Sequence, residues 1–150
     1  MNILIVDDAA DIRAFLKGIL SGKSWTLYEA SDGCSARNLI EQHDIDIVLT
    51  DWMMPGMNGI DLIQWIRGRH SDRYVYTILL TSRDHESDLI EGLSAGADDF
   101  LNKPVNATVL HARLDVAERI QRIQQDLLNQ QQTLMKSKNF LETAYQSVKN

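Results

Sequence analysis

Runs of apolar residues recur along the first hundred residues of the chain, separated by segments in which apolar residues return every three or four positions. The clearest runs are ILIV at residues 3–6, IDIVLT at 45–50 and TILLT at 77–81, and two weaker ones are WTLYEA at 25–30 and DFLNK at 99–103. Continuous rather than alternating apolar runs are typical of strands that are covered on both faces. The pattern therefore predicts five buried strands.

The segments between the runs have the spacing of amphipathic helices. The periodic apolar positions are Ile12, Phe15, Leu16, Ile19 and Leu20, then Leu62, Ile63 and Ile66, and then Leu89, Ile90 and Leu93. Alternating strands and helices favour a parallel sheet covered by helices, because parallel neighbours need a crossover connection. We expect a doubly wound α/β fold with a five-stranded parallel sheet in the flavodoxin-like order 2-1-3-4-5. Ligands of such sheets bind beyond the carboxyl ends of the strands.

The last third of the chain has a different pattern. No glycine or proline occurs from Ala107 to Val148, which predicts one helix over residues 107–148 that is roughly 60 Å long. Two sets of positions follow a heptad, the first being Ile120, Leu127, Leu134, Leu141 and Val148, and the second Val116, Ile123, Gln130, Ser137 and Ala144. A parallel two-stranded coiled coil that forms a homodimer is the preferred interpretation. A solvated amphipathic tail remains the alternative, because Gln130 and Ser137 interrupt the second set.

Length and charge narrow the class of protein. A chain of 150 residues suits one globular domain. Residues 1–112 carry nine Lys and Arg against seventeen Asp and Glu, a balance of −8, which argues against direct binding to nucleic acid. Cys34 is the single cysteine and no apolar run reaches the length of a membrane span, so we expect a cytoplasmic protein without a membrane segment.

Three carboxylates follow two of the central apolar runs. Asp7 and Asp8 come directly after ILIV, and Asp51 comes directly after IVLT. If these two strands are neighbours, the three side chains meet at one edge of the sheet, and unit charges about 4 Å apart repel by about 4 kcal/mol at an effective dielectric near 20. Such a cluster requires a cation, and hard oxygen ligands suit Mg²⁺.

The last two strands place complementary groups at the same edge. TILLTS ends with Thr81 and Ser82, whose hydroxyls can donate to an anion, and DFLNKP ends with Lys103, whose ammonium can pair with a phosphate. A carboxylate nucleophile, a metal site, a hydroxyl and an ammonium at one edge are the groups that phosphoryl transfer needs, because positioning and charge neutralisation supply most of that catalysis.

The chain resembles the receiver domain of bacterial two-component response regulators (CheY-like). The resemblance is carried by VDD at 6–8, TDWMMPGMNG at 50–59, LTS at 80–82, GADDF at 96–100 and KP at 103–104, in that order. It covers about residues 1–120. It implies a phosphorylation-activated signalling switch rather than an enzyme acting on a separate substrate, with a sensor histidine kinase or phosphotransfer protein as partner.

The resemblance also implies a role for each residue of the acidic edge. Asp51 matches the aspartate that accepts the phosphoryl group, Asp8 the direct Mg²⁺ ligand and Asp7 a ligand that acts through water. The backbone carbonyl of Met53 matches the third protein ligand. Met53 and Arg83 also occupy the positions that in this family tune how fast the phosphoryl group is lost.

The remaining matches concern the switch. Thr81 matches the hydroxyl that turns toward the phosphoryl group, Lys103 the lysine that pairs with it, and Phe100 the aromatic switch position. The bond between Lys103 and Pro104 matches a cis peptide of the family. Trp52, beside the acceptor, is expected to be half-buried.

Three other functions are less compatible with these residues. A haloacid dehalogenase-like phosphohydrolase carries its nucleophile after the first strand in a DxD pattern, whereas this chain has DDA there. A flavodoxin-like cofactor binder needs a turn rich in Ser, Thr and Gly after the first strand. A dimerisation module without phosphorylation would not need the full set of acidic and basic groups.

We expect that the long helix over residues 107–148 relays the signal to an output domain or partner. We also expect that the chain is a piece of a longer protein with its output domain missing.

Overall fold

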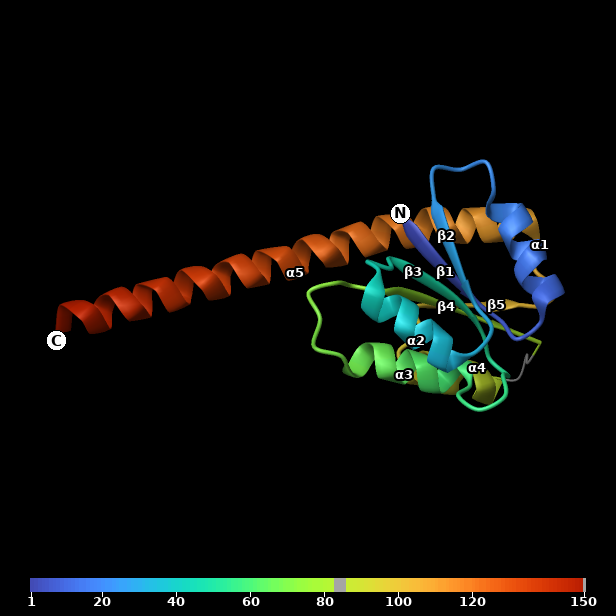
Figure 1. Ribbon diagram of the computed structural model, residues 1–150, viewed down its shortest axis with the longest axis horizontal. Helices are drawn as coiled ribbons and strands as arrows, with labels where there is room; N and C mark the ends of the chain where they lie inside the picture. Colours follow the sequence, from blue (N-terminus) through green and yellow to red (C-terminus); the bar gives the residue numbers. More distant parts are fainter. Residues whose placement is uncertain (83–85, 150) are drawn as a thin grey trace.

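The computed structural model describes residues 1–82 and 86–149, so Arg83 lies outside the described residues. Strands and helices alternate along the chain (Figure 1). The elements are β1 (Asn2–Val6), α1 (Ala10–Leu20), β2 (Thr26–Ala30), α2 (Gly33–Gln42), β3 (Ile47–Asp51), α3 (Gly59–Gly68), β4 (Tyr76–Thr81), α4 (Glu86–Ser94), β5 (Asp99–Asn102) and α5 (Ala107–Lys149).

All five strands belong to one parallel sheet with the order β2-β1-β3-β4-β5. This confirms the predicted fold class and strand order. Each of the five expected strands lies within two residues of its predicted bounds, and the largest shift is at β3, which begins at Ile47 rather than at residue 45. Differences of this size are usual at the ends of elements.

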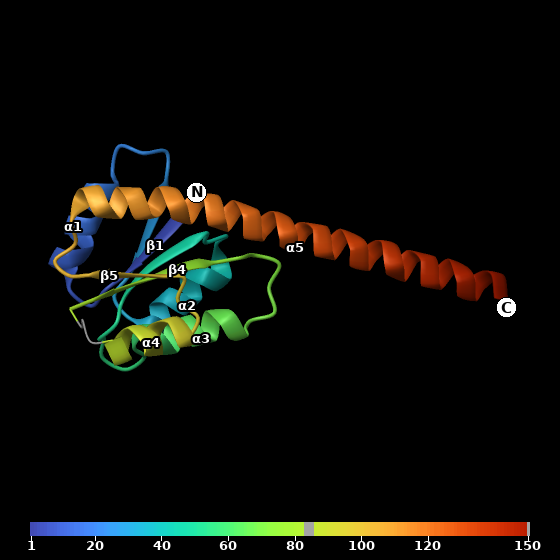
Figure 2. The same ribbon diagram turned by 180° about the vertical axis from the view of Figure 1, so that it is seen from behind.

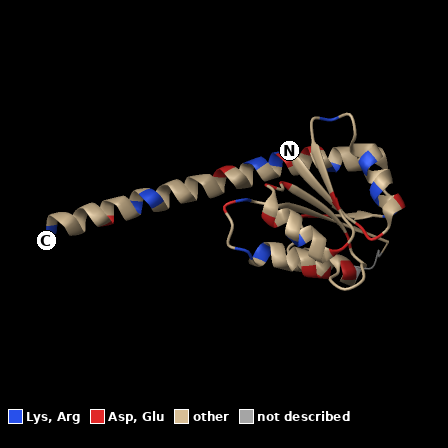
Figure 3. Ribbon diagram, viewed as in Figure 1, with Lys and Arg blue, Asp and Glu red and all other residues tan. Residues whose placement is uncertain are grey.

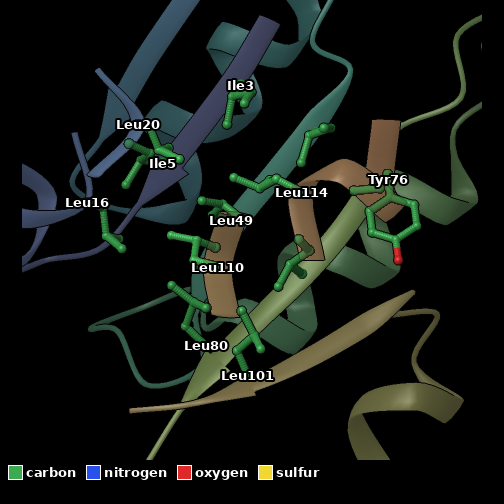
Figure 4. Packing of buried hydrophobic residues seen from close by; sticks show 13 residues of the cluster. Ile3, Ile5, Leu16, Leu20, Leu49, Tyr76, Leu80, Leu101, Leu110 and Leu114 are labelled. Carbon is green, nitrogen blue, oxygen red and sulfur yellow. The ribbon is translucent and has the colours of Figure 1, made fainter. Parts of the chain in front are cut away.

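Two layers of helices cover the sheet (Figures 1 and 2). On one face, α1 and the first turns of α5 pack on alternate strand residues, and Figure 4 shows Leu110 and Leu114 of α5 beside Leu49 and Leu80 of the sheet. On the other face, α2 and α3 bury Ile40 and Leu62 against a second set of strand residues. Because β1, β3 and β4 have helices on both sides, nearly every residue in them is buried, as the continuous apolar runs predicted.

The last helix extends far beyond the sheet (Figures 1 and 2). α5 has 43 residues, and its described side chains are all exposed from residue 129 onward. This agrees with the predicted long helix. Charges of both signs are sparse along the projecting part (Figure 3). In the described parts of the chain, no helix combines the length and the apolar character needed to cross a membrane.

Candidate functional site

The register of the sheet brings four strand ends to one edge. Val6 pairs with Thr50, so Asp7 lies beside Asp51, and Asp51 itself pairs with Leu80, next to Thr81. Thr81 in turn pairs with Asn102, the residue before Lys103. The side chains predicted at this edge are therefore neighbours in space, although they are up to 96 positions apart in the sequence.

Two kinds of charge meet at this edge, which we call the acidic site (Asp7, Asp8, Asp51 and Lys103). Carboxylate oxygens of Asp7, Asp8 and Asp51 all lie within 4.8 Å of one another. The Lys103 ammonium lies 3.2 Å from Oδ2 of Asp7 and 3.0 Å from Oδ1 of Asp51. Asp7 and Asp51 are buried, and Asp8 is exposed to solvent.

Burial and charge shift the ionisation of two groups in the acidic site. Burial raises the pKa of the Asp51 carboxyl, the negative charge of Asp7 raises it further, and the hydrogen bond from Lys103 offsets only part of this. Burial lowers the pKa of the Lys103 ammonium, but its hydrogen bond to Asp51 and the charges of Asp51 and Asp7 outweigh burial and raise the pKa overall. Lys103 therefore stays charged at neutral pH.

Asp7 is held by hydrogen bonds from several directions. Its Oδ1 accepts from the backbone N–H of Ala9 at 2.9 Å, and its backbone carbonyl accepts from Nη1 of Arg13 at 2.7 Å. Arg13 also donates to Glu29. Sequence reasoning did not single out Arg13, and the only signal was its position in the first turns of the helix that follows the acidic pair.

The loop after Asp51 comes very close to the strand it leaves. The N–H of Gly59 donates to the carbonyl of Trp52 at 2.8 Å, and a Cβ at Gly59 would lie 2.2 Å from the backbone oxygen of Asp51. Asn58 caps α3 in a capping box with Asp61. Because of the close approach of Gly59 to the Asp51 backbone, position 59 must be glycine if Asp51 is to keep its position. Met53, in the same loop, is 59% exposed.

Aromatic residues pack beside the site. Trp52 is only 2% exposed, so the expectation that it is half-buried was wrong. Its ring meets Phe100 edge-on at 6.2 Å between centroids. The reason for its burial is tertiary, since Trp52 packs in one cluster with Ile60 and Ile63 of α3 and Leu79 of β4. Thr81 is buried, and its carbonyl accepts from the N–H of Lys103, whose bond to Pro104 is cis.

The donor set fits a hard divalent cation. Three carboxylates and one ammonium leave a formal charge of −2 at the acidic site, which one divalent ion would neutralise. Every side-chain ligand offered is an oxygen, and the exposed position of Asp8 leaves room for the waters that Mg²⁺ keeps. Receiver domains bind Mg²⁺ at such an acidic cluster.

Comparison with known proteins gives a consistent result. The family model described as "Response regulator receiver domain" matches residues 3–115. The chain is 36% identical over 122 residues to chemotaxis protein CheY-3 of Vibrio cholerae serotype O1, an alignment that covers 80% of this chain and 94% of that protein. It is also 36% identical over 118 residues to the phosphate regulon transcriptional regulatory protein PhoB of Escherichia coli K12, covering 79% of this chain and 52% of PhoB.

Solved structures agree with the sequence relatives. The receiver domain of the Francisella response regulator 1452 is 31% identical, with a TM-score of 0.73, and the match covers 79% of this chain and 96% of that one. The match to the family over residues 3–115, with the strand order and the acidic edge, shows that this chain belongs to the response regulator receiver domain family.

Proposed function

We propose that this protein is a signalling switch in which Asp51 accepts a phosphoryl group from a histidine kinase or a phosphotransfer protein. Asp51 Oδ2 or Oδ1 forms the new O–P bond, the P–N bond of the phosphohistidine breaks, and the electron pair returns to the imidazole, which takes up a proton. The observation that carries the proposal is the ion pair of 3.0 Å between Lys103 and Asp51 inside a cluster of three carboxylates.

Asp7, Asp8, Asp51 and the backbone carbonyl of Met53 are the groups that would hold Mg²⁺. The bound ion supplies positive charge that offsets the charge of an incoming phosphoryl group. The Lys103 ammonium already contacts two of these carboxylates, so it is in place to pair with a phosphoryl oxygen. Hydrolysis of the acyl phosphate on Asp51 by water then resets the switch.

Thr81 and Phe100 form the conformational part of the proposal. Thr81 is at the end of β4, and Phe100, on β5, is partly buried against Trp52. The phosphoryl group adds negative charge and acceptor oxygens next to Thr81. We expect the Thr81 hydroxyl to turn toward it and Phe100 to move inward into the space released, which reshapes the surface of α4, β5 and α5.

The long helix is the proposed route by which the signal leaves the receiver domain, residues 1–120. Residues 107–148 form one unbroken helix that begins on the receiver domain and continues beyond it. Its projecting part carries an exposed stripe of apolar residues at heptad spacing, which includes Leu127, Leu134 and Leu141 and which we call the heptad stripe. A parallel homodimer through this stripe, coupled to an output domain or partner, is the proposed form of the relay. PhoB, of which this chain covers 52%, is an example of a longer relative.

Incubation with Mg²⁺ and acetyl phosphate, followed by intact-mass measurement, tests the acceptor. We expect a mass increase of one phosphoryl group in the wild type and none in Asp51→Asn, with Asp44→Asn, at an exposed aspartate, as the matched control. A phosphoryl group that is still taken up by Asp51→Asn would show that the acceptor is another residue. In a Trp25→Phe, Trp65→Phe background, which leaves Trp52 as the remaining tryptophan, fluorescence with beryllofluoride then reports whether the surroundings of Trp52 change.

A further inference from the structure

The face of α5 that packs on the receiver domain changes character where the helix leaves the sheet. Leu110, Leu114 and Ala117 are buried apolar residues, and the next residue on the same face is Gln121, which is 3% exposed. A side-chain amide in such a position is costly unless its polar atoms have hydrogen-bond partners. The partners of Gln121 therefore indicate what the amide does there.

Two glutamines of α5 bind both backbone groups of one residue in the loop between α3 and β4. Nε2 of Gln121 donates to the carbonyl of Tyr74 at 3.1 Å, and Oε1 of Gln125 accepts from the N–H of Tyr74 at 2.9 Å. Gln125 also donates to the carbonyl of Asp72 at 2.7 Å. We call this set, Gln121 and Gln125 with the backbone of Tyr74, the glutamine clamp.

The receiver side of the clamp is itself fixed. Gln121 also donates to Oδ1 of Asp46 at 3.4 Å, and Asp46 accepts from Arg73 at 2.8 Å and from the N–H of Asn2 at 2.8 Å. The Tyr74 hydroxyl donates to Asp98 at 2.7 Å. The clamp thus joins α5 to the amino-terminal ends of β1, β3 and β4, which is the edge opposite the acidic site.

The hydrogen bonds of the glutamine clamp form at one rotation of α5 about its axis. A slip of one residue turns an α-helix by about 100°, which would bring Ile120 or Arg122 to the position of Gln121. The first slip would place Ile120, which offers no hydrogen bond, at the partly buried carbonyl of Tyr74, although Gln124 would then replace Gln125. The second would place two charged side chains, Arg122 and Asp126, against the receiver domain. Buried polar contacts of this kind specify register more than they add stability.

The rotation decides where the heptad stripe points. Summing about 100° per residue places the stripe of Ile123, Leu127 and Leu134 roughly 135° around the helix from the receiver-facing residues. These three side chains are 59%, 46% and 69% exposed, respectively. Ile120, the first position of the stripe, is instead partly buried against the receiver core. From Ile120 onward, the first exposed position of the stripe is therefore Ile123, beside the clamp.

We propose that Gln121 and Gln125 are positioning residues that hold α5 at one rotation, so that its heptad stripe faces away from its own receiver domain and packs against the same stripe of a second copy. The second copy is favoured as the occupant because the apolar positions repeat every seven residues as far as Val148, the pattern that lets two such helices pack along their length. The inference rests on the proposed relay through α5.

Hydrogen exchange tests the positioning role in the full chain. The clamp variant Gln121→Ala with Gln125→Ala is expected to exchange the amides of residues 119–128 on the order of tenfold faster than the wild type, since the hydrogen bonds that tie this part of α5 to Tyr74 are lost. The control variant Gln131→Ala with Gln132→Ala removes two exposed glutamines and is expected to leave the rate unchanged. Equal rates in the clamp variant and the control would overturn the proposal.

Cross-linking between two copies tests the rotation. On a Cys34→Ser background, oxidation of Leu127→Cys is expected to give a covalent dimer, whereas Gln132→Cys, at an exposed position on the other side of the helix, is expected to give little. Gln121→Leu replaces the amide by an apolar side chain of similar size that can pack beside the buried Leu114 and Ala117, so the fold is kept. Adding it is expected to reduce the preference for cross-linking through Leu127→Cys severalfold. If Gln121→Leu left the preference for cross-linking through Leu127→Cys unchanged, or if Leu127→Cys gave no covalent dimer on the Cys34→Ser background, the proposal would be overturned.

Phosphorylation of the same variants separates this inference from the proposed function. The clamp is at the edge of the sheet opposite Asp51, so the clamp variants are expected to take up one phosphoryl group from acetyl phosphate as the wild type does. If the parent takes up none, the proposed function fails while exchange and cross-linking still decide whether the clamp sets the rotation of α5.

Discussion

Replacing Asp8 by Asn is expected to stabilise the metal-free protein while removing its response to Mg²⁺. Asp8 is the exposed member of three carboxylates within 4.8 Å of one another, and the ion pairs of Lys103 are made with Asp7 and Asp51. Asp8 therefore faces two negative charges and one positive charge, which leaves roughly one unbalanced repulsion. In the metal-free protein Asp8 is therefore expected to lower folding stability, which a bound cation would offset.

The size of the effect follows from Coulomb's law. One repulsion across 4.8 Å amounts to about 0.9 kcal/mol at the dielectric of water and about 3.5 kcal/mol at an effective dielectric near 20. Because Asp8 is exposed, we expect a gain in the free energy of unfolding near the lower value, about 1 kcal/mol. The gain should shrink as NaCl is added, because salt screens exposed charges.

Urea denaturation in EDTA and at saturating MgCl₂ measures both halves of this prediction. The wild type is expected to gain stability from Mg²⁺, whereas Asp8→Asn starts more stable in EDTA and gains little. Asp115→Asn, at an exposed aspartate on α5, removes the same unit of net charge and is the control. If Asp8→Asn were less stable than the wild type in EDTA, the electrostatic account of the acidic site would be refuted.

Three further predictions concern the same site. Lys103→Met breaks both ion pairs and is expected to lower the metal-free free energy of unfolding by about 3 kcal/mol, with part of the loss restored by MgCl₂ in urea titrations; no loss in EDTA would contradict it. Because burial raises the pKa of Asp51, the Asp51 carboxyl contributes its full stability at pH values below the usual carboxyl pKa, and this contribution is lost as the pH rises through the raised pKa of the folded state. In EDTA, the free energy of unfolding of Asp51→Asn should therefore increase relative to that of the wild type as the pH rises. If the two free energies changed in parallel with pH, this would count against the prediction. Gly59→Ala would place a Cβ 2.2 Å from the Asp51 carbonyl and is expected to cost about 3 kcal/mol and to slow phosphorylation of Asp51, whereas normal stability by thermal unfolding would show that the loop can shift freely.

Much of the fold follows from local pattern. The apolar runs at 3–6, 45–50 and 77–81 became β1, β3 and β4 because strands buried on both faces must be apolar throughout. The long helix was predictable because nothing between Ala107 and Val148 interrupts a helix. Asp7, Asp8, Asp51, Thr81 and Lys103 were likewise recognisable, since each lies at the end of an apolar run or next to it, and the carboxyl ends of parallel strands meet at one edge of the sheet. Met53 and Phe100 were identified only through the resemblance to the receiver family.

Other features depend on contacts between distant segments. The burial of Trp52 is set by the second helical layer, and the requirement for glycine at position 59 comes from its approach to the Asp51 backbone. Gln121 and Gln125 read as solvent-facing residues of a polar helix, yet they are hydrogen-bonded to Tyr74, about fifty positions earlier.

The sequence by itself therefore determined which segments form strands and helices and which residues carry the chemistry, because these depend on side-chain type and on spacing along the chain. Only the tertiary structure decided the distances within the acidic site and the rotation of α5. Both depend on sheet register and on packing between segments far apart in the sequence, and no local pattern encodes these.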